Sequence, residues 1–105
     1  MRTIDHWIDG AVTSSTSGRV GPVYNPATGQ QQAAVALASV EEVDAAVAAA
    51  KAAFPGWRNT SLSRRAEVMF RFRELVVSHR DEIAELVSIE HGKVPSDAAG
   101  ELARG

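Results

Sequence analysis

The composition of the chain changes abruptly near Ser39, and this change most restricts the folds open to it. Residues 1–38 hold only four charged side chains and are rich in glycine, serine, threonine, valine and glutamine. Residues 39–93 are instead rich in alanine, glutamate, arginine and leucine. The first pattern favours strands and turns, whereas the second favours amphipathic helices. We therefore expect a β-ribbon and turn segment over residues 1–38 and a helical segment over residues 39–105, both within one domain.

Turn signals divide the first segment into short strands. Asp9-Gly10 is a strong turn signal because glycine accepts a positive φ. The residues from Asn25 to Gly29 predict a second turn, in which Pro26 fixes φ and favours an extended Asn25. The predicted strands are residues 6–8, 11–13, 19–24 and 31–38. The simplest arrangement is a pair of antiparallel ribbons that lie on a larger body, since a two-stranded hairpin is marginal alone.

Capping signals set the predicted helices. Ser39 is a suitable N-cap and Glu42 follows three residues later, which is the capping-box pattern, and Pro55-Gly56 predicts the end of this helix. Further helices are predicted from Leu62 or Ser63 to about Ser78, from Arg80 to Gly92, and onward from a cap at Ser96 or Asp97.

The predicted helices carry wide apolar faces that two light ribbons cannot cover. The first has an apolar stripe through Val40, Val43, Val47 and Phe54, beside a face rich in alanine. The last predicted helix has only just begun when the sequence reaches Gly105. We therefore expect that the sequence is a piece of a longer chain and that its helices lie against a partner outside it.

The overall composition excludes several classes of function. The formal net charge is −2, so the chain has no basic excess with which to bind nucleic acid. It has no cysteine, which excludes disulfides, zinc–thiolate sites and a thiol nucleophile within these residues. No apolar run approaches the length of a membrane span, and the first ten residues lack the apolar core of a signal peptide. The expectation is a cytoplasmic protein.

No familiar catalytic or cofactor motif is present. The sequence has no Gly-x-Gly-x-x-Gly loop, no Walker loop and no nucleophile elbow, and its three histidines stand far apart. No catalytic, cofactor-binding or metal-binding residue is therefore predicted. Arg104 lies three residues after Glu101 and has two interpretations. It forms an exposed intrahelical ion pair, or its guanidinium binds the carboxylate of a ligand.

Several segments, taken in order, resemble the N-terminal region of the aldehyde dehydrogenase superfamily. They are Trp7-Ile8-Asp9-Gly10, Tyr24 to Gly29, the alanine-rich stretch from Val40 to Ala53, Phe54-Pro55-Gly56-Trp57, Arg64-Arg65, and Ile89-Glu90-His91-Gly92-Lys93. Within the superfamily, the stretches from Ser63 to Phe72 and from Glu101 to Gly105 look most like the methylmalonate-semialdehyde dehydrogenase branch, which is CoA-acylating.

This resemblance implies an α/β fold in which the chain is the N-terminal part of an NAD-binding domain. It implies a tetrameric enzyme that uses NAD and CoA to oxidise a semialdehyde through attack by a cysteine thiolate. The nucleophile and the cofactor-binding residues of the family lie beyond residue 105, so the chain alone is expected to be inactive and to bind neither cofactor. Arg104 matches the arginine of the branch that is thought to bind the substrate carboxylate.

Two other interpretations remain open. The chain could belong to an aldehyde dehydrogenase that hydrolyses its thioester, such as a betaine- or succinate-semialdehyde type. It could also be a helical interaction module without catalysis, which would form a monomer that folds cooperatively by itself.

Overall fold

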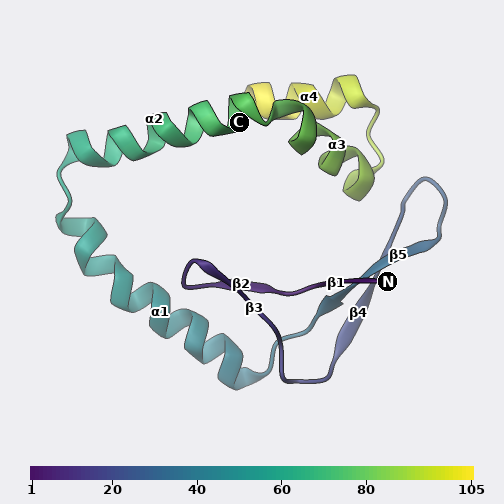
Figure 1. Cartoon of the computed structure of the whole chain (residues 1–105), viewed down its shortest axis with the longest axis horizontal. Helices are drawn as coiled ribbons and strands as arrows, with labels where there is room; N and C mark the ends of the chain where they lie inside the picture. The colour runs from purple at the N-terminus through teal and green to yellow at the C-terminus, as the bar shows by residue number, and fades with distance from the viewer. The chain divides into compact units, whose positions relative to one another are not determined.

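The computed structural model describes all 105 residues, and its contacts divide them into two compact units. Unit 1 comprises residues 1–24 and 31–60, and unit 2 comprises residues 25–30 and 61–105. The strands are β1 (Arg2–Ile4), β2 (His6–Ile8), β3 (Ala11–Thr13), β4 (Val20–Tyr24) and β5 (Gln31–Ala36). The helices are α1 (Val40–Asn59), α2 (Leu62–Ser78), α3 (Arg80–His91) and α4 (Pro95–Arg104). Figure 1 labels these elements along the chain.

The strands of unit 1 form a three-stranded sheet and a separate hairpin. In the sheet, β5 lies in the middle, antiparallel to β4 and parallel to β1. The hairpin pairs β2 with β3 around Asp9 and Gly10, both of which have positive φ, as the turn signal predicted. The two antiparallel ribbons are confirmed. The parallel strand β1 was not predicted, because its partner residues begin at Ala33 and no local signal connects the two segments.

Helix α1 begins as predicted but extends further than predicted. The Ser39 hydroxyl accepts a hydrogen bond from the Glu42 amide, and the Glu42 carboxylate accepts one from the Ser39 amide, which completes the capping box. The predicted end at Pro55-Gly56 is wrong, since the helix continues to Asn59. Proline removes one intrahelical hydrogen bond. The final turn is nevertheless closed, because the Thr60 amide donates to the Trp57 carbonyl and the Thr60 hydroxyl donates to the Gly56 carbonyl.

The alanine-rich face of α1 borders the β2–β3 hairpin. Ala46, Ala49, Ala50 and Ala53 line a groove together with residues 7–10, and its volume is about 370 Å³. The small side chains on this face leave the groove open between the helix and the hairpin.

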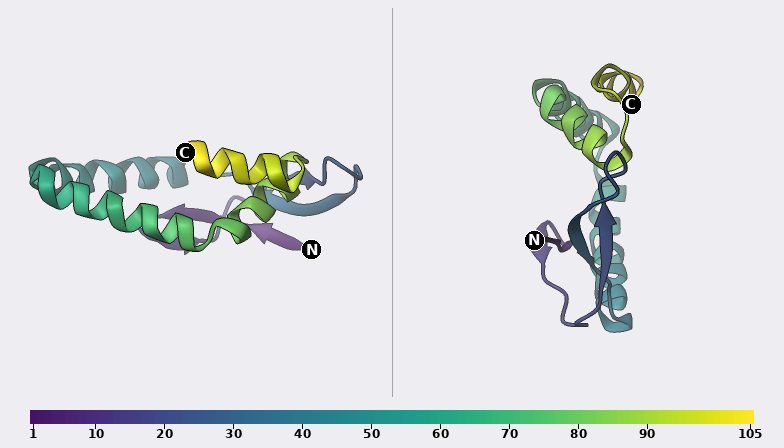
Figure 2. Two further views of the ribbon diagram at one scale, coloured as in Figure 1. Left: turned by 90° about the horizontal axis from the view of Figure 1, so that it is seen from above. Right: turned by 90° about the vertical axis from the view of Figure 1, so that its right-hand side faces the viewer.

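Unit 2 contains the other three helices and the turn formed by residues 25–30. Helix α2 has the predicted bounds, and Gly92 ends α3 in the left-handed conformation, as predicted. Helix α4 begins at Pro95 after Val94, so the predicted cap at Ser96 or Asp97 is wrong. Proline suits the first helical position because the amide it lacks would have no intrahelical partner there. Helix α4 packs against α3, and Figure 2 shows these two helices close together.

The chain buries very little of its apolar surface. The only buried hydrophobic residues are Ala33, Ala36, Ala84 and Ala98. Large apolar side chains on α1 and α2 are exposed, including Val47 at 60%, Phe54 at 58% and Phe70 at 68%. A monomeric soluble protein rarely leaves so much apolar surface on contiguous helix faces. None of the helices combines the length and the apolar character needed to cross a membrane.

Candidate functional site

Unit 2 has a groove between α2 and the last turn of α4, with a volume of about 830 Å³. Apolar side chains of α2 form most of one wall, and the last turn of α4 forms the other. Its lining residues are Met69, Phe70, Phe72, Arg73, Val76, Val77 and residues 101–105. The groove therefore has mainly apolar walls. The guanidinium groups of Arg73 and Arg104 and the carboxylate of Glu101 lie at its border.

Arg104 lies in the last turn of α4 and is exposed. Its Nη1 atom lies 3.5 Å from the position that a Cβ atom would occupy on Gly100, so the side chain folds back over its own helix. Arg104 forms no ion pair with Glu101 or with any other carboxylate of the chain. Its guanidinium is therefore available to an anion from outside this segment.

Glu101 pairs with Lys93 instead of Arg104. The Lys93 ammonium donates a hydrogen bond to the Glu101 carboxylate, which joins the α3–α4 loop to α4. Both side chains are half-buried, with 25% of Lys93 and 40% of Glu101 exposed. The Lys93 hydrogen bond is the main cause that lowers the pKa of Glu101, partial desolvation opposes it, and the charge of Arg104 contributes least.

This arrangement can bind an organic anion but contains no catalytic set of its own. An unpaired guanidinium beside apolar side chains suits a small ligand with an apolar body and a terminal carboxylate. No group of three or more histidine, cysteine, aspartate or glutamate side chains is placed to hold a metal ion. The chain also has no cysteine that could act as a nucleophile.

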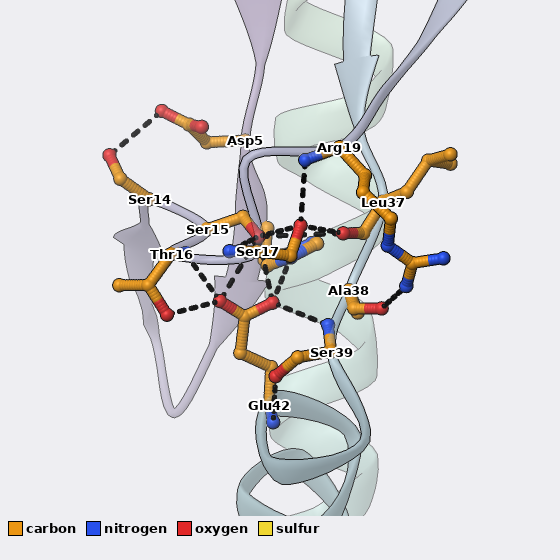
Figure 3. A network of polar contacts seen from close by, with 11 residues as sticks. Asp5, Ser14, Ser15, Thr16, Ser17, Arg19, Leu37, Ala38, Ser39 and Glu42 are labelled. Carbon is orange, nitrogen blue, oxygen red and sulfur yellow. Dashed lines mark hydrogen bonds and ion pairs between the residues drawn. The ribbon is translucent and has the colours of Figure 1, made fainter.

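A second polar cluster lies in unit 1 around the Glu42 carboxylate (Figure 3). Beyond Ser39, this carboxylate accepts hydrogen bonds from the Thr16 amide at 2.6 Å and the Ser15 hydroxyl at 2.8 Å. His6 Nε2 lies 3.3 Å from the same group. These contacts tie the loop of residues 14–18 and strand β2 to the start of α1. They lower the pKa of Glu42 to about 2, with the Thr16 and Ser39 amides as the largest causes.

The Glu42 cluster is structural, since its carboxylate is held by hydrogen bonds from the Thr16 amide, the Ser39 amide and the Ser15 hydroxyl. The sequence predicted its Ser39–Glu42 part from the capping box alone. It missed Ser15 and Thr16, because hydroxyl residues in a polar loop carry no signal of a distant carboxylate partner.

The structure answers one question that the sequence left open about Arg104. The first interpretation, an intrahelical ion pair between Arg104 and Glu101, does not hold, because the Glu101 carboxylate pairs with Lys93. Lys93 and Arg73 were not predicted as neighbours of the site. Lys93 precedes Glu101 by eight residues across a loop, a spacing at which no regular helix places two side chains together. The histidines do not meet: His6 contacts Glu42 and His79 contacts Glu82.

Comparison with known proteins gives consistent results. The family model described as the aldehyde dehydrogenase family matches residues 12–105. Malonate-semialdehyde dehydrogenase 3 of Geobacillus kaustophilus is 52% identical over 104 residues, which are 99% of this chain and 22% of that protein. Methylmalonate-semialdehyde dehydrogenase of Oceanimonas doudoroffii has a similar structure, with a TM-score of 0.94 and 49% identity over 99% of this chain and 21% of that one.

A third similar protein comes from Sinorhizobium meliloti. It is assigned as a methylmalonate-semialdehyde dehydrogenase and its structure was determined in complex with NAD. The TM-score is 0.94 and the identity 47%, over 99% of this chain and 21% of that one.

The chain thus spans about a fifth of the length of its relatives, as expected for part of a longer protein. The similarity in structure also confirms the predicted fold class, in which short ribbons precede the helices. From its sequence and its fold alike, the chain belongs to the aldehyde dehydrogenase family.

Proposed function

We propose that this chain is part of an NAD-dependent, CoA-acylating methylmalonate-semialdehyde dehydrogenase, in which Arg104 binds the carboxylate of the substrate. The intact enzyme would oxidise methylmalonate and malonate semialdehydes to propionyl-CoA and acetyl-CoA. The observation that carries this proposal is the unpaired Arg104 guanidinium at the border of an apolar groove. A semialdehyde acid has an aldehyde at one end and a carboxylate at the other, and a planar guanidinium binds a carboxylate through two parallel hydrogen bonds.

The relatives support this choice of substrate. The similar proteins named above act, by their names, on malonate or methylmalonate semialdehyde. Each of these substrates carries a free carboxylate. The segment from Glu101 to Gly105, which contains Arg104, lies inside the region that the family model matches.

The residues of this chain do not fit an NAD site. Its four helices begin after Ser39, Ser61, His79 and Val94, and none of them follows a glycine-rich turn that could receive a pyrophosphate. We therefore place the contacts to NAD and CoA, together with the cysteine nucleophile, in the remainder of the enzyme. We further propose a cytoplasmic homotetramer, as the family resemblance implies, with residues 1–38 and 39–105 both in its NAD-binding domain.

The test uses a chimera in which this chain replaces the matching 104 residues of malonate-semialdehyde dehydrogenase 3 of Geobacillus kaustophilus. Arg104→Leu in this chimera should lower kcat/KM for methylmalonate semialdehyde by about 100-fold, since a charge-assisted contact contributes about 1.5–3 kcal/mol. The value for propanal, which lacks the carboxylate, should change by less than about threefold, within the range of an uninvolved surface substitution. Arg71→Leu is the matched control, because Arg71 is exposed on α2 and does not line the groove.

Equal losses for the two aldehydes would show that Arg104 does not recognise the carboxylate. The acyl acceptor separates the proposal from its main alternative, a hydrolytic aldehyde dehydrogenase. A complete enzyme that carries this segment should require CoA for turnover, and release of the free acid without CoA would favour the hydrolytic alternative.

A further inference from the structure

Lys93 is a basic residue close to the groove between α2 and α4, although it does not line the groove itself. It lies in the loop between α3 and α4, directly after Gly92, and its ammonium group contacts the Glu101 carboxylate. Glu101 does line the groove and stands one helical turn before Arg104. Glu101 therefore has two possible cationic partners, Lys93 in the preceding loop and Arg104 on its own helix.

The Glu101 carboxylate is the natural competitor of a substrate for Arg104. Side chains three residues apart on a helix face the same side, and a glutamate at that spacing readily pairs with an arginine. An arginine that is already paired must lose that partner before it can bind an external carboxylate. In this structure Glu101 pairs with Lys93, and Arg104 remains unpaired.

We propose that Lys93 is a positioning residue for substrate recognition: it holds Glu101 away from Arg104 and so leaves the guanidinium unpaired for the substrate carboxylate. This inference rests on the proposed function of Arg104. Its support is the Lys93–Glu101 contact, the absence of a Glu101–Arg104 ion pair, and the position of Glu101 on the groove wall. The lowered pKa of Glu101 agrees with it, because Lys93 is the main cause and Arg104 the smallest.

The test is a double-mutant cycle in the chimera. Lys93→Met should raise KM for methylmalonate semialdehyde about tenfold, the effect of one lost charge-assisted hydrogen bond, because Glu101 is then able to pair with Arg104. KM for propanal and kcat for both aldehydes should change by less than about twofold. Glu101→Gln should leave KM within about twofold, since an amide competes weakly for a guanidinium. The double variant Lys93→Met/Glu101→Gln should return to the value of Glu101→Gln alone.

Two further variants keep the test decisive. Lys51→Met is the matched control, because Lys51 is the only other lysine and lies exposed on α1 in the other unit. Lys93→Arg retains the charge and should keep KM near that of the parent chimera. If Lys93→Met does not fold, Lys93→Gln replaces it in the cycle.

The outcomes separate this inference from the proposed function. If Arg104→Leu discriminates between the two aldehydes but the double variant stays as impaired as Lys93→Met, then Lys93 acts through its own charge and the inference is wrong. A rise in KM for propanal as large as that for the semialdehyde would also overturn it. If Arg104→Leu itself fails to discriminate, the proposed function is the part that fails.

Discussion

Replacing Gly92 by alanine should destabilise the end of α3 by about 2 kcal/mol. Gly92 has φ 85° and ψ 7°, a left-handed conformation that costs an L-residue about 1–2 kcal/mol. A Cβ atom at this position would also lie 3.1 Å from Cγ of Pro26, so the turn of residues 25–30 would have to shift. Hydrogen exchange of the last α3 turn in the chimera reports local opening. The amides there, including the Gly92 amide bonded to Ser88, should exchange about 30-fold faster.

Gly29 provides the matched control for this prediction. It also has a positive φ of 72°, but a Cβ atom there would meet nothing within 4 Å. Gly29→Ala should therefore show only the conformational cost, about 1 kcal/mol, as local opening of its own turn. Pro26→Ala should recover the difference when combined with Gly92→Ala. Equal effects of the two glycine substitutions, or no recovery with Pro26→Ala, would refute the contact between residue 92 and Pro26.

Two further predictions concern the start of α1. Ser39→Ala removes the N-cap hydroxyl and should destabilise the first turn of α1 by about 1 kcal/mol, measured as faster hydrogen exchange of its amides, whereas Ser39→Asp should retain most of the protection. Glu42→Gln should loosen the loop of residues 14–18, with a difference from the parent chimera that depends on pH. Because folding lowers the pKa of Glu42 from 4.5 to about 2, the stabilisation is complete above pH 4.5 and is lost as the pH falls through about 2. Denaturant unfolding between pH 7 and pH 2 should give a constant difference above about pH 5 that shrinks at lower pH, and a difference that does not change with pH would contradict the assignment.

Local signals in the sequence predicted most of the secondary structure. The capping box at Ser39, the glycine after α3 and the Asp9-Gly10 turn each depend on one or two residues and their own backbone, so they can be identified without the fold. Strand β1 could not be found in this way. Its hydrogen-bond partners begin 31 residues later, at Ala33, and its three residues carry no strong pattern.

The errors at helix ends have a different cause. Proline usually ends a helix, but the Pro55 signal was overridden by contacts of the final turn that only the structure reveals. At Pro95 the same residue type begins a helix. Ser96 and Asp97, which follow it, are the more common types of N-cap residue, and for this reason the start of the helix was predicted too late.

The candidate site was predictable only in part. Arg104 was found by its likeness to a family segment, and its chemistry follows from the guanidinium alone. The sequence could not show that Lys93 pairs with Glu101, because the conformation of the α3–α4 loop determines whether this carboxylate contacts Lys93 or Arg104. Side chains that meet across a loop carry no periodic signal, so the state of Arg104 had to come from the structure.

The parallel pairing of β1 with β5 has a consequence for the order of folding. Arg2 pairs with Ala33, so β1 joins the sheet of unit 1 only when residues 31 positions apart meet, whereas each turn of α1 to α4 joins residues four apart. Helical turns form within about a microsecond, but contacts between distant residues must first overcome the entropy of loop closure. We therefore expect the helices to acquire hydrogen-exchange protection before the central strand does, with the registration of β1 on β5 as the slowest step within this segment.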